Sequence, residues 1–328
     1  MRRLAPIIAL LVSVAGAFTG AGHAVASETS CPAGATRIVR VVSATGLQSA
    51  LGRALPGDQI RLADNVYAGH FTLTRSGLKA HHIVVCGDRG AILDGGNMQS
   101  GYTLHLVGSR WVDIVGVTVR HAQKGIVVDT GQHDTLRSLA VHDVGDEAIH
   151  LRRNTTYSAV LTSVIYNTGR RSATYGEGVY VGSASDNWCQ QTGCQPDRSD
   201  HTTIAGNVIG PGVPAEEIDV KEGTSSGLIA NNSFDGQSMT RAQSWVDVKG
   251  NSWVIRANAG NDSAVNGFSV TLAVAGWGNK NVFLSNHAIV NARGYGFKIA
   301  RGVVGDIVYT NNVVQNARNG ACNVPEQA

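Results

Sequence analysis

The sequence has few aromatic residues, few prolines and few charges for its length. Of its 328 residues, 6% are aromatic and 16% are charged, and it holds 7 prolines beside 40 glycines. A hydrophobic fraction of 43% supplies enough apolar material for a sizeable core and argues against a disordered chain. Many glycines with few aromatic side chains are typical of short strands joined by tight turns.

The chain also lacks a strong excess of charge and, after its first residues, any long hydrophobic run. Arg2 and Arg3 precede an apolar stretch and a small-residue cleavage site ending at Ala26, which predicts a signal peptide over 1–26 and a secreted domain over 27–328. A membrane anchor is the alternative, but this run is short, and no other segment could span a bilayer. Removing the signal peptide lowers the formal charge from +3 to +1, so we expect neither a nucleic-acid partner nor a membrane.

A cluster of cysteines that could bind zinc is absent as well. All five cysteines follow the predicted signal peptide. In an oxidising compartment Cys189 and Cys194 are close enough in sequence to form a disulfide, and Cys31 with Cys86 is a second candidate pair that would leave Cys322 free. No histidine or second cysteine pair lies near the Cys-x4-Cys spacing, so we expect structural disulfides rather than a metal site.

The chain instead contains a repeat. A five-residue pattern with apolar second and fourth positions recurs eight times, and the middle residues of successive pentads are 22 to 39 residues apart. The pentads begin at Thr103, Gly125, Ala148, Gly178, Glu217, Trp245, Gly267 and Gly296. Period-two strands at such spacing, without helical patterns between them, are typical of coils stacked in a solenoid. We therefore predict an all-β fold, a single-stranded right-handed parallel β-helix; the rival β-sandwich need not repeat at one-coil spacing.

A second register supports the same fold. Five asparagines each lie three residues after an apolar or aromatic strand residue, and they are 25 to 28 residues apart. Asn tolerates the left-handed backbone of a tight turn and can hydrogen-bond its equivalent in the next coil, so we predict a structural ladder. Its members are Asn207, Asn232, Asn258, Asn286 and Asn312. At the amino end, the amphipathic stretch 47–55 predicts a short helix that caps the exposed strand edges of the solenoid.

The alternation within each pentad predicts which side chains reach solvent. Second and fourth residues fill the core, whereas first, third and fifth residues point outward and form columns across coils about 4.8 Å apart. Four consecutive coils then share one charged surface, made of His150, Arg152, Tyr180, Glu217, Asp219, Lys221, Trp245, Asp247 and Lys249. Like charges stack there, which costs stability unless a ligand or metal uses them. The inserted loop 188–200 lies beside these coils and could wall a groove.

These side chains suit a polysaccharide that carries uronic acids. A lysine beside a second lysine could act as a base, and stacked carboxylates offer the oxygen ligands that Ca²⁺ prefers. Lys, Arg or Ca²⁺ could neutralise a uronate carboxylate and make the proton on the adjoining carbon removable. We expect a groove that holds an extended, anionic polysaccharide.

Three segments resemble a known family. The run Glu-Ile-Asp-Val-Lys-Glu-Gly over 217–223, followed by Asn-Ser-Phe over 232–234, is similar to the segment that carries the lysine base in the chondroitinase B and alginate lyase family, which are pectin-lyase-like parallel β-helix proteins. In the next coil, Val-Asp-Val-Lys-Gly over 246–250 falls where that family has an Arg-His-Gly motif. The amino-terminal segment 47–67 is similar to the start of those enzymes.

The resemblance implies that Lys221 removes the proton, that Lys249 takes the place of the arginine, and that Glu217 with Asp219 belongs to a Ca²⁺ site. The leading hypothesis is a secreted, monomeric polysaccharide lyase that acts by β-elimination. Charge stabilisation would come from Lys249, Arg152 or Ca²⁺. Tyr180 or His150 would protonate the leaving oxygen. Substrate contacts are expected from a further set, Trp245, Asp247, Glu177 and Trp188.

Two other functions are consistent with the same sequence. A glycoside hydrolase of this fold would use Asp219 and Asp247 with Glu217 or Glu177 as acid and base, and its products would carry no new double bond. A non-catalytic module would bind sugars on Trp245, Tyr180 and Trp188 and release them unchanged. One scaffold hosts many functions, so the fold does not separate these three.

Overall fold

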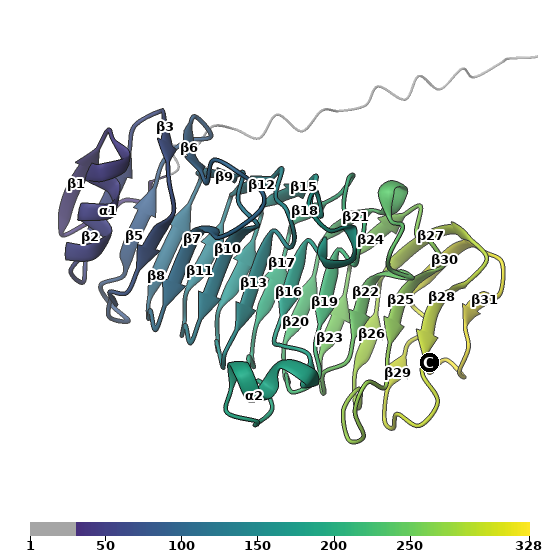
Figure 1. Cartoon of the computed structure of the whole chain (residues 1–328). Helices are drawn as coiled ribbons and strands as arrows, with labels where there is room; N and C mark the ends of the chain where they lie inside the picture. Colours follow the sequence, from purple (N-terminus) through teal and green to yellow (C-terminus); the bar gives the residue numbers. More distant parts are fainter. Residues whose placement is uncertain (1–30) are drawn as a thin grey trace, which may run out of the picture.

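The computed structural model describes residues 31–328, which form three parallel sheets of 11, 10 and 10 strands. The predicted signal peptide over 1–26 lies outside the described residues. Figure 1 shows the coils stacked along one axis from the purple amino end to the yellow carboxyl end. Successive coils add one strand to each sheet, and the neighbouring strands pair in parallel. The predicted right-handed parallel β-helix is therefore confirmed.

We refer to the three sheets as A, B and C. Sheet A holds β1 (Arg37–Val41), β2 (Asp58–Leu62), β5 (Ile83–Cys86), β8 (Val112–Val115), β11 (Thr135–Arg137), β14 (Ala159–Leu161), β17 (Thr203–Ala205), β20 (Leu228–Ala230), β23 (Val254–Arg256), β26 (Val282–Leu284) and β29 (Ile307–Val308). Sheet B holds β3 (Asn65–Ala68), β6 (Ala91–Asp94), β9 (Thr118–Arg120), β12 (Ala140–His142), β15 (Val164–Tyr166), β18 (Val208–Ile209), β21 (Ser233–Asp235), β24 (Ala259–Asn261), β27 (His287–Ala292) and β30 (Val313–Ala317). Sheet C holds β4 (Phe71–Leu73), β7 (Tyr102–Val107), β10 (Lys124–Asp129), β13 (Ile149–Arg152), β16 (Val179–Val181), β19 (Ile218–Val220), β22 (Ser244–Val248), β25 (Asn266–Val270), β28 (Tyr295–Ile299) and β31 (Gly320–Cys322).

The predicted pentads are the strands of sheet C. Their second and fourth residues face the interior, as Ile149 and Leu151 of β13 do, and both are buried. Toward the carboxyl end the core becomes aromatic, because Phe268 and Phe297 stack with ring centres 5.2 Å apart. This continuous apolar interior fixes which residues of each pentad point outward.

The asparagine ladder is also confirmed. In each step the Nδ2 of one Asn donates to the Oδ1 of the next, as from Asn232 to Asn258 at 2.9 Å and from Asn258 to Asn286 at 3.0 Å. These asparagines do not themselves adopt the left-handed backbone that we expected. In most coils the preceding residue does, as Asn231 with φ 54° and Ala257 with φ 53°. That residue turns the chain and aims the amide of the asparagine along the stack.

Replacing one ladder member should destabilise the solenoid locally. Asn258 accepts from the backbone N–H of Asn232 and donates to the carbonyl of Ile229, both at 3.0 Å. We expect Asn258→Ala to lower the free energy of unfolding by about 2–4 kcal/mol, because it leaves buried polar groups without partners. Chemical denaturation measures this loss. The exposed Asn311 bonds Ser285 at 2.9 Å, so Asn311→Ala should cost less than about 1 kcal/mol; equal losses would contradict a special role of the ladder.

A short helix packs against the first strands at the amino end. Helix α1 (Ala44–Arg53) begins after Ser43, whose side chain accepts from the N–H of Gly46. The helix buries Leu47, Ala50 and Leu51 and contacts β1 to β4. Its function as a cap stays a prediction.

Both predicted disulfides are present. They join Cys31 to Cys86 and Cys189 to Cys194, and Cys322 is free. Within residues 31–328, none of the helices has the length and apolar character needed to cross a bilayer.

The long steps of the repeat correspond to insertions around sheet C. The loop between β15 and β16 contains η1 (Ala173–Tyr175), and the loop between β16 and β17 contains η2 (Ser185–Asn187) and α2 (Trp188–Gln191). A third insertion, between β21 and β22, contains η3 (Gly236–Ser238). The first and second insertions lie at opposite ends of β16, so they flank the outer face of sheet C.

Candidate active site

The outer face of sheet C carries the predicted column of third-position side chains. In the parallel register His150 pairs with Tyr180, Tyr180 with Asp219, and Asp219 with Asp247. The alternation within the pentads therefore predicted correctly that these four residues lie side by side on successive coils.

A groove of about 600 Å³ runs over this column. Arg171 and Tyr175 line it from the loop before β16, Asn187 and Gln191 line it from the loop after β16, and Arg241 lines it from the insertion before β22. Its lining includes six Lys or Arg side chains and six Asp or Glu side chains. The groove is thus strongly polar but nearly balanced in charge, so any preference for an anion depends on where individual cations lie.

The centre of the groove is a buried carboxylate between two lysines. Lys221 Nζ lies 2.6 Å from one oxygen of Asp219, and Lys249 Nζ lies 2.6 Å from the other. Lys249 also pairs with Asp247 at 2.7 Å, and Lys221 Nζ lies 4.9 Å from the ring centre of Tyr180. The two ammonium groups are therefore not left unpaired, so the stacking of like charges costs less stability than the sequence suggested.

Burial and these ion pairs set the protonation states. Burial would lower the pKa of Lys221, but the carboxylate of Asp219, with Glu177 and Glu216, raises it overall. Burial would raise the pKa of Asp219, but Lys249 and Lys221 lower it. Burial together with Asp219 raises the pKa of Tyr180 well above its usual value. Near neutral pH the site thus holds two ammonium groups, one carboxylate between them and a neutral phenol.

His150 adds a neutral imidazole. Burial lowers its pKa, although Glu147 opposes this shift. Nε2 lies 2.8 Å from the carbonyl oxygen of Gly182, which assigns the proton to Nε2. Nδ1 lies 3.3 Å from Glu147. His150 lines the groove, and its ring centre lies 4.4 Å from that of Tyr180.

A column of three glutamates lines the same groove, and only one of them was expected. Glu147, Glu177 and Glu216 each precede a pentad by one residue, and the N–H after Glu147 donates to the carbonyl of Glu177 at 3.0 Å. Lys124 pairs with Glu147 at 2.6 Å. The signal was present in the sequence as a Glu before three successive pentads. It could not be interpreted without knowing how the chain bends there.

Two expected site residues lie elsewhere. Glu217 and Trp245 were predicted to point outward, but both are fully buried. Strand β19 begins at Ile218, so the outward alternation does not extend back to Glu217, and Glu216 faces the groove instead.

Trp245 packs into the corner between sheets B and C. Its ring centre is 5.7 Å from that of Phe268, and its Nε1 donates to the carbonyl of Asn261 at 3.1 Å. A Cβ at Gly260 or Gly267 would come within 2.8 Å of the indole, so glycines on neighbouring strands make room for it. Trp245 therefore stabilises the core and offers no stacking platform to a sugar.

The remaining candidates lie at or beside the groove. Arg152, Glu177 and Asp247 line it. Trp188 begins α2 and donates from Nε1 to the carbonyl of Ser183 at 2.9 Å, while its neighbours Asn187 and Gln191 reach the groove. A contact between Trp188 and a substrate stays a prediction.

One set of carboxylates could hold a metal ion. Oxygens of Glu177, Glu216 and Asp219 lie within 4.8 Å of one another, so Glu216 replaces the predicted Glu217 in this set. Burial and neighbouring acids raise the pKa of Glu177, and they raise that of Glu216 to about 7. One oxygen of Glu177 is buried without a partner. An all-oxygen set that is under-neutralised in this way fits a cation such as Ca²⁺.

Comparison with solved structures finds a relative above 30% identity that spans most of the chain. An alginate lyase from Paenibacillus sp. str. FPU-7 is 33% identical, with a TM-score of 0.79 over 88% of this chain and 100% of that one. Pectate lyase Pel9A is 15% identical with a TM-score of 0.59, covering 90% of this chain and 82% of that chain. A mannuronic acid specific family 6 lyase from human gut microbiota is 17% identical with a TM-score of 0.63, covering 87% of this chain and 66% of that chain. The last two show likeness of fold alone. No family model and no curated protein matches the sequence.

Proposed function

This chain belongs to the alginate lyase family of parallel β-helix polysaccharide lyases, and on that premise we propose that it cleaves a uronic-acid-containing polysaccharide by β-elimination with Lys221 as the base. The observation that carries the proposal is the groove over sheet C, where Lys221 lies between Asp219 and the ring of Tyr180. Alginate is the first substrate to test, because the Paenibacillus relative is an alginate lyase. Two disulfides and the predicted signal peptide support a secreted enzyme.

The proposed reaction needs a base, an acid and a stabilised anion. The free amine of Lys221 removes the proton from the carbon that carries the uronate carboxylate. The electron pair left behind forms a carbon–carbon double bond as the glycosidic carbon–oxygen bond breaks. The leaving oxygen takes a proton from the phenol of Tyr180, whose raised pKa keeps it protonated. Lys249 stabilises the negative charge that builds on the uronate.

A simple assay tests this function. Purified protein is incubated with alginate, pectate, glucuronan and glycosaminoglycans while ultraviolet absorbance and reducing ends are followed together. A lyase raises both signals on its own substrate, because each cleavage creates one double bond and one reducing end. Reducing ends without absorbance would replace this proposal by hydrolysis.

The raised pKa of Lys221 predicts an alkaline enzyme. The ammonium must lose its proton before it can act, and Asp219 favours the charged form. We therefore expect kcat/KM to increase as the pH rises above neutral, measured at constant ionic strength. A profile that falls above neutral pH would contradict Lys221 as base and favour a group of lower pKa such as His150.

A bound divalent cation would be held by Glu177, Glu216 and Asp219, where it would supply positive charge for the substrate carboxylate. We expect added Ca²⁺ to raise the melting temperature of the wild-type protein and to have no such effect on Glu177→Gln, which loses a carboxylate of this set. Glu326→Gln, in the exposed carboxyl-terminal tail, is the control and should respond like wild type. An equal response of all three proteins would place the ion elsewhere.

A further inference from the structure

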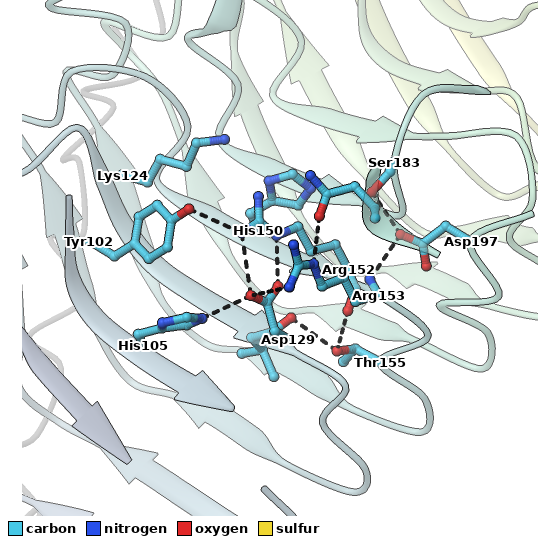
Figure 2. A network of polar contacts seen from close by, with 12 residues as sticks. Tyr102, His105, Lys124, Asp129, His150, Arg152, Arg153, Thr155, Ser183 and Asp197 are labelled. Carbon is cyan, nitrogen blue, oxygen red and sulfur yellow. Dashed lines mark hydrogen bonds and ion pairs between the residues drawn. The ribbon is translucent and has the colours of Figure 1, made fainter. Parts of the chain in front are cut away.

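Arg152 lies in a polar network with Asp129 and Tyr102 (Figure 2). It ends β13 and pairs in register with Asp129 of β10. Its Nε donates to Asp129 at 2.6 Å, and its Nη2 donates to Asp129 at 3.3 Å and to the hydroxyl of Tyr102 at 3.1 Å. Two of the three guanidinium nitrogens thus have fixed partners.

The partners of Arg152 are themselves held in place. Asp129 is 4% exposed, and its second oxygen lies 2.9 Å from Nε2 of His105. Burial would raise the pKa of Asp129, but His105 and Arg152 lower it, so the carboxylate stays charged. Tyr102 also packs edge-on against His105 with ring centres 5.0 Å apart. Arg152 is therefore positioned before any substrate arrives.

The third nitrogen has no such partner. Among the described residues, Nη1 of Arg152 makes no hydrogen bond, and the side chain lines the groove while 9% of its surface is exposed. The free N–H groups of Nη1, on a charged guanidinium at the wall of the groove, can donate charge-assisted hydrogen bonds to one carboxylate.

We propose that Arg152 binds the carboxylate of a second uronate unit, in a subsite beside the one where the bond breaks. This inference rests on the proposed function, since it needs a uronate polymer in the groove. Lys221 follows β19, two coils beyond β13, so the backbones of the two residues lie about 10 Å apart along the solenoid axis, and Arg152 reaches back to Asp129 on the far side from Lys221. One carboxylate cannot contact both at that separation, so Arg152 recognises a neighbouring unit and takes no part in the elimination.

The test measures binding without turnover. In a Lys221→Ala background, calorimetry follows short oligouronates prepared from alginate, and the same oligomers after reduction of their carboxylates to alcohols. We expect Arg152→Gln to weaken binding of the charged oligomers by about tenfold or more and to leave binding of the neutral ones unchanged. Arg152→Lys keeps the buried positive charge, but one ammonium group cannot bond Asp129 and Tyr102 and also reach the substrate as the guanidinium does. We therefore expect Arg152→Lys to recover little of the lost affinity.

A matched control comes from sheet B. Arg120 pairs with Asp94 of the preceding coil at 2.8 Å, the same kind of ion pair outside the groove, so Arg120→Gln should bind both oligomers like the parent. Equal affinity of Arg152→Gln and its parent for charged oligomers would overturn the subsite alone. If the parent binds no oligouronate, the uronate substrate itself is rejected, and both proposals fail. Should Arg152→Gln not fold, Arg152→Lys provides the same comparison.

Discussion

Lys221→Ala is expected to lower kcat/KM by about 100- to 10,000-fold, the range that a positioned acid or base contributes. The methyl group cannot accept the proton, and no other amine of the groove lies over the ring of Tyr180. Release of unsaturated product, followed by ultraviolet absorbance, measures the loss. The melting temperature and circular dichroism should show that the solenoid remains folded.

The control for this variant is a lysine outside the groove. Lys79 is exposed in the turn before β5, so Lys79→Ala should retain wild-type turnover. If Lys221→Ala keeps more than about a tenth of the activity, Lys221 is not the base. In that case the raised pKa of Lys221 would describe an ammonium that only stabilises charge.

The largest expected effect on stability comes from Asp219→Asn. Asp219 is 1% exposed and lies 2.6 Å from each of two lysine nitrogens. Asparagine removes the carboxylate paired with Lys221 and leaves Lys249 with Asp247 alone, so we expect the free energy of unfolding to fall by about 3–5 kcal/mol. Denaturant titration at neutral pH measures this change.

The same variant should also shift the pH dependence of activity. Asp219 raises the pKa of Lys221, so its removal lowers that pKa and moves the rising limb of the pH profile to lower pH. The contribution of Asp219 to stability also increases with pH. Because its pKa is lowered in the folded protein, this contribution is present above the unfolded value and disappears as the pH falls.

A second carboxylate allows a matched comparison for these effects. Asp94 also bonds two side chains from the next coil, Arg120 and the neighbouring His121, but these side chains are partly exposed and lie at sheet B. Asp94→Asn should cost less stability than Asp219→Asn and leave the pH profile unchanged. A similar loss in both variants would mean that the two lysines add nothing special at Asp219.

The sequence predicted the parts of this molecule that depend on strand periodicity. His150, Tyr180, Asp219 and Asp247 could be stacked correctly because each lies at the centre of a pentad, where flanking apolar residues determine its direction. The asparagine ladder followed from even spacing alone.

The positions at the strand ends could not be inferred in the same way. Whether Glu216 or Glu217 faces the groove depends on where β19 begins, which no periodic pattern marks. The buried position of Trp245 depends on glycines that lie on other strands, at Gly260 and Gly267. The groove walls come from irregular loops such as the one that carries Gln191, whose course is set by tertiary contacts.

The unequal spacing of the repeat shows that the length of the loops and the alignment of the strands vary independently in this chain. Successive pentads are between 22 and 39 residues apart, yet their central residues remain in parallel register. Length differences are absorbed in the turns, so a loop can grow or shrink without moving Asp219 relative to Tyr180. Evolution can therefore remodel the rim of the groove for a new polymer, or for a different length of polymer, while the reacting groups stay where the solenoid holds them.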